Sequence, residues 1–291
     1  MEALLTLLRL QKAGNAPEEY EDASCPNESG RREGAELRFA VADGASEGML
    51  SGAWARILVE LHCRYDWTAR SMDQFLESAY GDWRAYTSEY LRGRETRRAP
   101  VQWYEEPGFE GGAFSSLLGL TLAGPPQGWP GEWTAIAVGD SCLFQVRGGA
   151  LVKAFPLERS SDFNNRPVLL ASNPARNDQA VGAARRMSGT FEAGDVFYLM
   201  TDALARWALK EDEEGGHPWM VLRDHATRDP RVFGAWIAAL RQDRELRNDD
   251  VTVLRIDLPG PQQDRSRPAS RPEKEKSTPD IERTLHEESH C

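Results

Sequence analysis

The sequence contains little cysteine and little histidine, and neither residue is arranged as a soft-metal site. Four cysteines and five histidines occur in 291 residues. The cysteines, at positions 25, 63, 142 and 291, show no CxxC or zinc-ligand spacing, and no histidine has a partner at metal-ligand spacing. We therefore expect a reduced protein whose metal chemistry, if it has any, does not depend on thiolate or imidazole.

Long hydrophobic runs are also missing. No apolar segment approaches the ~20 residues that a membrane-spanning helix needs. The first residues, Met1-Glu2-Ala-Leu-Leu, have neither the basic region nor the apolar length of a signal peptide. These absences predict a soluble, cytoplasmic protein that does not contact a membrane.

Acidic residues outnumber basic residues. Asp and Glu total 46 against 35 Lys and Arg, for a net charge of −11, which argues against general nucleic-acid binding because that rests on a positive surface. An acidic enzyme with anionic substrates would need a local basic rim. The candidates for it are Arg31, Arg32, Arg185 and Arg186. The alternative is that these arginines are ordinary solvated surface.

The hydrophobic content is sufficient for a sizeable core, with 40% hydrophobic residues and nine tryptophans. Apolar residues at helical spacing predict helices at residues 49–65, 71–91 and 231–246. Short apolar runs predict strands at residues 37–42, 111–122, 132–138, 143–147, 150–155, 195–201 and 251–258. Two successive helices after a strand indicate a helical layer over a sheet.

For two segments the sequence leaves more than one interpretation. Residues 3–10 fit a strand or a short helix, because periodicity does not arbitrate between them. Residues 157–190 are polar and contain several Asn and Pro residues. They are predicted to be a long irregular segment, either a functional lid or an exposed insertion.

Acidic residues stand repeatedly at the ends of the predicted strands. Asp43-Gly44 ends the strand at 37–42, Asp202 ends the strand at 195–201, and Asp249 and Asp250 open the last strand. Three carboxylates at strand ends are what an oxygen-ligated divalent metal site requires. Taken singly, each motif is more often a turn or a solvated loop.

The order of the acidic motifs resembles that of a known family. The motifs run from Glu21-Asp22 through Asp43-Gly44, Gly139-Asp140-Ser141 and Thr201-Asp202-Ala203 to Asn248-Asp249-Asp250-Val-Thr-Val. This succession resembles the metal-dependent protein serine/threonine phosphatases of the protein phosphatase 2C family, bacterial type. The resemblance covers roughly residues 3–258. It implies an α+β fold, a four-layer α-β-β-α sandwich of two antiparallel sheets flanked by helices.

The same resemblance implies a role for each acidic residue. Asp43 would bridge two metal ions, Asp202 and Asp249 would ligate the first, and Glu21 would hold the second, partly through water. Asp140 is expected to orient its loop rather than to bind metal. The implied catalytic residues are Asp43, Asp202 and Asp249. The implied metal ligands are Glu21, Asp22, Asp43, Gly44 (through its carbonyl), Asp202 and Asp249.

The implied reaction is hydrolysis of phosphoserine or phosphothreonine in proteins, with two Mn²⁺ or Mg²⁺ ions as cofactors. Two ions about 3.5–4 Å apart lower the pKa of a shared water, and the resulting bridging hydroxide attacks phosphorus in line. No cysteine nucleophile is needed, so Cys142 is interpreted as a small core residue. The implied partner is a phosphorylated protein, either a serine/threonine kinase or its target.

The resemblance also fixes the expected domain organisation. Residues 1–259 are predicted to be one protein phosphatase 2C-like catalytic domain. Residues 260–291 are predicted to be a disordered charged tail, because their aliphatic residues are limited to Ala269, Ile281 and Leu285. Such a segment buries too little apolar surface to offset its ordering entropy.

The chain departs from the family pattern at three places. Ala45 stands where many relatives have a histidine, Ala203 replaces a glycine, and the segment from Pro17 to Tyr20 lacks the arginine that binds substrate phosphate. An alternative is therefore a catalytically weak or inactive regulatory binding module with the same fold. A further alternative treats the acidic residues as ordinary turn residues of an unrelated α+β domain.

Overall fold

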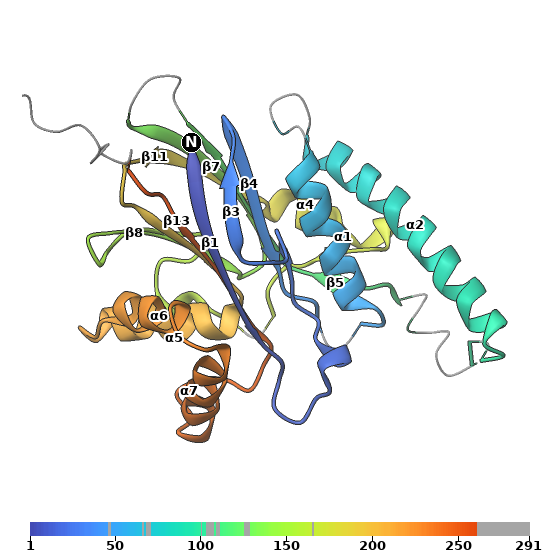
Figure 1. The fold of residues 1–291 in the computed structure, drawn as a ribbon. Helices are drawn as coiled ribbons and strands as arrows, with labels where there is room; N and C mark the ends of the chain where they lie inside the picture. Colours follow the sequence, from blue (N-terminus) through green and yellow to red (C-terminus); the bar gives the residue numbers. More distant parts are fainter. Residues whose placement is uncertain are drawn as a thin grey trace, which may run out of the picture. The chain divides into compact units, whose positions relative to one another are not determined.

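Two antiparallel sheets lie at the centre of the unit formed by Met1–Gly260 (Figure 1). The computed structural model describes residues 1–45, 48–65, 67, 71–99, 101–102, 108, 111–124, 129–164 and 166–260. The six-stranded sheet has the order β3 (Gly30–Glu33), β1 (Glu2–Leu10), β13 (Val251–Asp257), β12 (Val196–Met200), β8 (Cys142–Arg147) and β9 (Ala150–Phe155). The five-stranded sheet has the order β11 (Arg185–Phe191), β7 (Gly131–Val138), β6 (Leu117–Ala123), β4 (Glu36–Ala42) and β2 (Ala23–Cys25). A separate pair joins β5 (Phe114–Ser115) to β10 (Leu170–Ala171).

Helices cover the outer face of each sheet. The helices are α1 (Ser51–Arg64), α2 (Met72–Thr96), α4 (Asp178–Ala183), α5 (Asp202–Glu213), α6 (Pro218–Ala226) and α7 (Pro230–Gln242). Helix α1 packs on the five-stranded sheet and α2 packs against α1, whereas α5 to α7 pack on the six-stranded sheet (Figure 1). Three hydrophobic clusters result, one between the sheets and one under each helical layer. The predicted four-layer α-β-β-α sandwich is confirmed.

The central strands are apolar on both faces because each face meets another layer. In β4, Phe39 and Val41 belong to the cluster between the sheets, whereas Ala40 and Ala42 face α1. Successive side chains of a strand point to opposite faces, so a strand buried on both sides is a continuous apolar run rather than an alternating one. This explains why short apolar runs predicted these strands.

Residues 3–10, which the sequence left open between a strand and a short helix, form most of strand β1. This strand pairs with β13 and β3.

Helix ends follow from local backbone conformation. Helix α2 begins after Ser71, whose side chain accepts a hydrogen bond from the Gln74 amide, and it continues to Thr96 rather than ending near 91. Helix α7 ends at Gln242, before the predicted 246, because Arg244 takes a left-handed conformation (φ 61°).

The prediction of one long irregular segment at 157–190 was wrong, because residues 178–190 contain α4 and most of β11. Strand β11 is an edge strand paired with β7. Its outward side chains Arg186, Ser188 and Thr190 are polar and exposed, so the strand lacks the apolar signal of the central strands. The short helix α6 was also not predicted. The predicted tail lies outside the described residues, except for Gly260.

None of the described helices is both long enough and apolar enough to cross a membrane.

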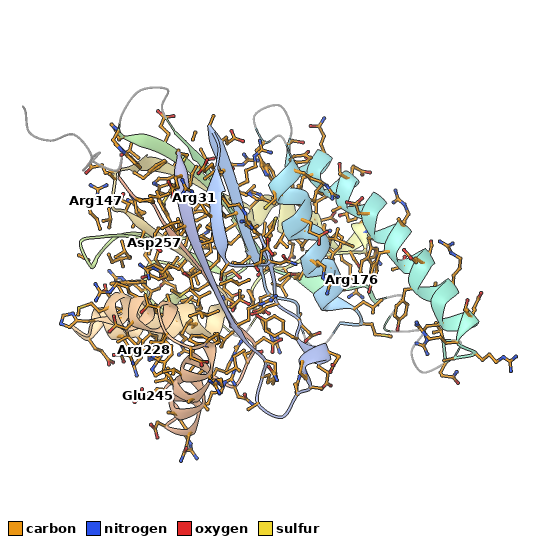
Figure 2. All side chains as sticks on the ribbon, in the orientation of Figure 1. Arg31, Arg147, Arg176, Arg228, Glu245 and Asp257 are labelled. Atoms are coloured by element: carbon orange, nitrogen blue, oxygen red, sulfur yellow. The ribbon has the colours of Figure 1, made fainter. Side chains whose placement is uncertain are left out.

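A buried aspartate ties the ends of three strands together. Asp195, whose side chain is fully buried, receives hydrogen bonds from Arg147 Nε (2.6 Å) and Gln145 Nε2 (2.7 Å). Arg147 Nη2 (2.9 Å) and the backbone amide of Glu192 (3.0 Å) also donate to this carboxylate. Arg147 lies at the end of β8 (Figure 2). Burial alone would raise the pKa of Asp195, but these hydrogen bonds lower it below its ordinary value.

We expect Asp195→Asn to lower the free energy of unfolding at pH 7 by about 2–3 kcal/mol, because an amide nitrogen then faces donors and Arg147 loses its partner. A carboxylate with a depressed folded-state pKa stabilises the fold above its unfolded pKa of about 4, and this stabilisation is lost as pH falls through the folded pKa. Urea unfolding at pH 7 and pH 3 should therefore show a difference between variant and wild type that shrinks at low pH. Asp224→Asn, in an exposed ion pair with Arg223, is the control and should change little. An equal loss at both pH values would contradict the role of the charge.

Candidate metal centre

Aspartates from both sheets converge at one end of the sandwich. Asp43 directly follows β4 of the five-stranded sheet, and Asp202 follows β12 of the six-stranded sheet as the first residue of α5. Asp249 precedes β13, which is the neighbour of β12. Asp43 is affected electrostatically by Asp22, Asp202, Asp249 and Asp140. These five residues are called the acidic cluster below.

The acidic cluster holds more negative charge than its surroundings offset. The pKa of Asp43 lies well above its ordinary value, first because the carboxylate is removed from water and then because the other four carboxylates repel its ionised form. Burial, followed by repulsion from Asp202, raises the pKa of Asp140 to about 7. Such a concentration of carboxylates is stabilised by a cation and destabilised without one.

Asp22 is held by two threonines from the strands that carry the other carboxylates. Its Oδ2 accepts hydrogen bonds from Thr201 Oγ1 (3.0 Å) and Thr252 Oγ1 (2.7 Å). Its Oδ1 is buried without a hydrogen-bond partner among the described residues, as is Oδ1 of Asp202. Buried carboxylate oxygens are nearly always satisfied in native proteins. These two orphaned oxygens fit an oxygen-ligated divalent cation.

The backbone around Asp43 is fixed by a serine network. Its amide donates to Ser116 Oγ (2.9 Å), and its carbonyl accepts from the Ser116 amide and from Ser115 Oγ (both 2.9 Å). The Ser116 hydroxyl in turn lies 2.7 Å from Ser141 Oγ. The Gly139-Asp140-Ser141 turn therefore supports the position of Asp43 through Ser141, while Asp140 belongs to the acidic cluster.

Glu21 and Gly44 lie side by side. A Cβ on Gly44 would come within 2.8 Å of the carbonyl oxygen of Glu21 and of the carbonyl carbon of Ser51, so only glycine fits this close approach. The Glu21 amide donates to Oδ2 of Asp250 at 2.7 Å, and Oδ1 of Asp250 accepts from the Lys12 amide at 2.7 Å. Asp250 thus anchors the loop that carries Glu21, whereas Asp249 faces the acidic cluster.

A side-chain cation, Arg247, lies between two of the predicted ligands. Its Nη2 is 2.5 Å from Oδ2 of Asp202 and 2.6 Å from Oδ2 of Asp249. In the described part of the chain, no three His, Cys, Asp or Glu side chains are arranged to hold a metal ion as they stand. The donor types and the orphaned oxygens fit a divalent ion, but Arg247 must release at least one carboxylate to admit it.

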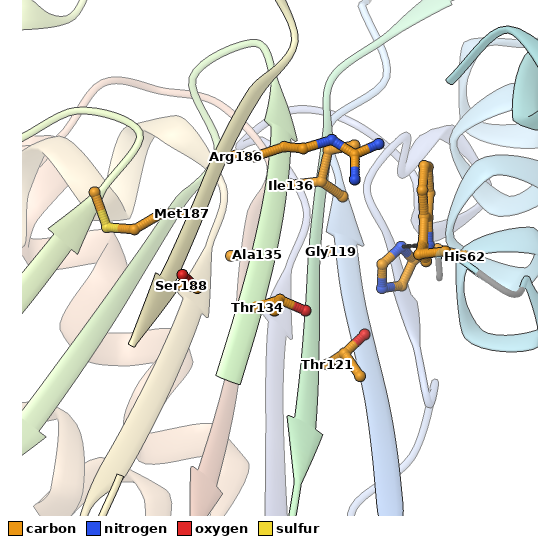
Figure 3. Close-up of a pocket in the computed structure, with 10 residues that line it drawn as sticks. His62, Gly119, Thr121, Thr134, Ala135, Ile136, Arg186, Met187 and Ser188 are labelled. Atoms are coloured by element: carbon orange, nitrogen blue, oxygen red, sulfur yellow. Dashed lines mark hydrogen bonds between the residues drawn. The ribbon is translucent and has the colours of Figure 1, made fainter. Parts of the chain in front are cut away.

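A cavity of about 270 Å³, separate from the acidic cluster, opens on the outer face of the five-stranded sheet (Figure 3). His62, Trp67, Thr121, Thr134 and Arg186 are among its lining residues, and none of the lining residues is acidic. The His62 ring is buried, and burial lowers its pKa to about 3. Its Nδ1 accepts a hydrogen bond from Trp67 Nε1 at 2.9 Å. Without carboxylates, this cavity does not fit the hard-metal chemistry of the acidic cluster.

Comparisons with known proteins locate the fold. No protein-family model and no curated protein matches the sequence. Among solved structures, a bacterial serine phosphatase matches with a TM-score of 0.52 and 13% identity, over 89% of this chain and 98% of that chain. The catalytic domain of the serine/threonine phosphatase PstP in complex with two manganese ions matches with a TM-score of 0.45 and 16% identity, over 89% and 100%. RsbX in complex with magnesium matches with a TM-score of 0.45 and 17% identity, over 88% and 96%.

The chain has the protein phosphatase 2C fold. An unrelated α+β domain is thereby excluded. Within this phosphatase fold, the acidic cluster lies at the strand ends from which the sequence predicted metal ligands. Arg247 was given no role from the sequence. Its position two residues before Asp249 is the signal from which a contact with the predicted ligands could have been expected.

We expect Arg247→Ala to destabilise the metal-free protein by about 1–2 kcal/mol, because Asp202 and Asp249 lose their counter-charge at a half-exposed site. Mn²⁺ should then stabilise the variant more than it stabilises wild type, since the metal no longer competes with the guanidinium. Thermal unfolding in EDTA and across a Mn²⁺ titration measures both effects. Arg231→Ala, which removes the exposed pair with Asp229, should leave the Mn²⁺ response unchanged. An unchanged Mn²⁺ response in Arg247→Ala would contradict the competition.

Proposed function

We propose that the protein is a metal-dependent protein phosphatase that hydrolyses phosphoserine and phosphothreonine in other proteins, with two Mn²⁺ or Mg²⁺ ions as cofactors. The acidic cluster is the observation that most supports this proposal. It combines excess negative charge, hard oxygen donors and orphaned carboxylate oxygens at one end of a phosphatase fold. The proposed ligands are the carboxylates of Glu21, Asp22, Asp43, Asp202 and Asp249, and the carbonyl oxygen of Gly44.

When bound, the two ions would supply a water of lowered pKa as the nucleophile and would offset negative charge on the phosphoryl group. In the hydrolysis itself, the oxygen of water bonds to phosphorus and the bond from phosphorus to the serine or threonine oxygen breaks. The products are inorganic phosphate and the free hydroxyl, whose oxygen receives a proton that the attacking water gives up.

The side chains of the protein have three tasks in this proposal. The backbone of Asp43 is held by Ser115 and Ser116, which fixes the point at the end of β4 from which its carboxylate extends. Asp202 and Asp249 are attached to adjacent strands, which fixes their separation. Arg247, once released from them, is a half-exposed guanidinium beside the reaction site. Guanidinium binds phosphate oxygens well, so Arg247 is proposed to replace the arginine that the segment from Pro17 to Tyr20 lacks.

We expect wild type to release phosphate from p-nitrophenyl phosphate and from a phosphothreonine peptide in Mn²⁺, and to lose this activity in EDTA. Asp43→Asn should lower kcat by about 10³-fold or more, because it removes the carboxylate that would hold the two ions. The same variant should raise the melting temperature of the metal-free protein by roughly 2–4 °C, the shift produced by relieving about 1 kcal/mol of repulsion.

The matched control is Glu89→Gln on α2, which removes an exposed carboxylate outside the acidic cluster. It should keep both activity and Mn²⁺ binding. Calorimetric titration with Mn²⁺ tests the ligands independently of turnover. Binding of Mn²⁺ by Asp43→Asn with wild-type affinity would contradict the assignment.

The second candidate function is a catalytically weak or inactive phosphatase-fold module that regulates a partner by binding it. Two observations favour it: Arg247 already neutralises two predicted ligands, and Ala45 has no proton to give to the leaving oxygen. No phosphate release in Mn²⁺ or Mg²⁺, together with no bound metal, would support this candidate over the phosphatase.

A further inference from the structure

A basic cavity of about 500 Å³ adjoins the acidic cluster. Asp202, a member of that cluster, is one of its lining residues, so the cavity and the candidate metal centre are continuous. Five basic side chains line it, against two acidic ones, Asp202 and Glu245. Glu245 lies just beyond the end of α7 (Figure 2). The basic residues are Arg206, Lys210, Arg241, Arg244 and Arg247. In a chain with a net charge of −11, this local excess of positive charge stands out.

Much of this positive charge is available to a ligand. Within the part of the chain that the structure describes, Arg206 and Arg244 are exposed and form no ion pair. Lys210 has only a long contact to Glu214, at 3.8 Å between exposed side chains. Positive side chains lining a concave surface raise the local concentration of anions and steer them toward it. The cavity therefore favours an anionic occupant.

Backbone hydrogen bonds hold Arg241 and the turn that carries Arg244 in place. The guanidinium of Arg241 donates to the carbonyl oxygens of Gln11 (3.1 Å) and Asp249 (2.6 Å), which binds the end of α7 to the loop carrying Asp249. The amides of Glu245 and Leu246 donate to the Leu240 carbonyl at 2.9 and 3.1 Å. Arg244 therefore projects from a fixed turn at the end of the helix.

The spacing of the cations along α5 matches an extended peptide. Asp202, Arg206 and Lys210 are four residues apart, so all three lie on one face of the helix. At 1.5 Å per residue, Arg206 and Lys210 lie about 6 and 12 Å from Asp202 along the axis. An extended peptide advances about 3.3 Å per residue and presents alternate side chains on one side. If the phosphorylated residue lies beside Asp202, the side chains two and four residues away from it would reach Arg206 and Lys210.

The arginines that the sequence marked as a possible basic rim lie elsewhere. Arg31 is paired with Glu2 (3.0 Å) and Glu33 (2.6 Å), and Arg32 is paired with Glu28. Arg185 donates to the Pro156 carbonyl, and Arg186 lies over the Trp67 ring. None of these four lines the basic cavity.

We propose that the basic cavity selects acidic phosphoprotein segments, in which Asp or Glu side chains stand two and four residues away from the phosphoserine or phosphothreonine. This inference rests on the proposed function, because it takes the acidic cluster as the place where the phosphoryl group is bound. The partner is therefore a protein with a phosphorylated, locally acidic segment, and the cavity supplies specificity that the metal site alone does not.

The test compares two phosphothreonine peptides that differ only in having Asp or Ser at those positions, on both sides of the phosphothreonine. With Mn²⁺, wild type should show a kcat/KM about tenfold higher for the Asp peptide, mainly through a lower KM, and this advantage should fade at 0.5 M NaCl. The double variant Arg206→Gln/Arg244→Gln should reduce the ratio of the two kcat/KM values toward one. Arg84→Gln on α2, an exposed arginine outside the cavity, is the matched control and should keep the wild-type ratio.

Fluorescence anisotropy of the labelled Asp peptide, measured without metal, separates this inference from the proposed function. Turnover with equal kcat/KM for both peptides would overturn the acidic preference and leave the phosphatase proposal intact. Absence of turnover, with salt-sensitive binding that the double variant loses, would overturn the phosphatase proposal and support the acidic partner. If the double variant does not fold, Lys210→Gln alone should lower the ratio partway. An unchanged ratio in a folded variant would overturn the proposal.

Discussion

Like charges forced together are the constraint on which the organisation of this protein depends. Five aspartates share one end of the sandwich, where burial and mutual repulsion raise the pKa of Asp43 well above its ordinary value. The described part of the chain offsets this charge with Arg247, which contacts two of the carboxylates. A divalent cation would relieve repulsion that folding has already imposed, and this supports the proposal that the acidic cluster holds one.

The packing of the four layers stabilises the strands that carry these repelling carboxylates. The cluster between the sheets and the clusters under each helical layer stabilise strands β4, β12 and β13 along their lengths. Their ends can therefore carry groups that disfavour folding. The supporting polar contacts are specific as well: Ser116 fixes the Asp43 backbone, and Thr201 and Thr252 hold Asp22. Rigid strands and hydrogen bonds from supporting side chains are what hold a site in one geometry.

Charge is segregated at the end of the sandwich that carries the acidic cluster. The acidic cluster suits cations, while the adjoining basic cavity suits anions, and Asp202 and Arg247 lie where the two meet. The proposed partner, a phosphorylated acidic segment, would need both regions, since its phosphoryl group would approach cations and its acidic neighbours would otherwise be repelled by a protein of net charge −11. Helix α5 connects the two regions, because its first residue is Asp202 and its next turns carry Arg206 and Lys210.

The sequence by itself determined the features that depend on neighbouring residues: apolar runs that become central strands, helical periodicity in α1, α2 and α7, and aspartates at strand ends. The motif order also indicated the fold. Tertiary structure decided whatever depends on segments far apart in the chain. The polar edge strand β11 is a strand only because β7 pairs with it, and the basic cavity forms only where the end of α7 approaches α5. Likewise, Arg247 became the counter-ion of Asp202 because β12 and β13 are adjacent. Local patterns report which face of an element is buried, whereas charge pairing and cavity shape arise from the packing of elements that the sequence does not place side by side.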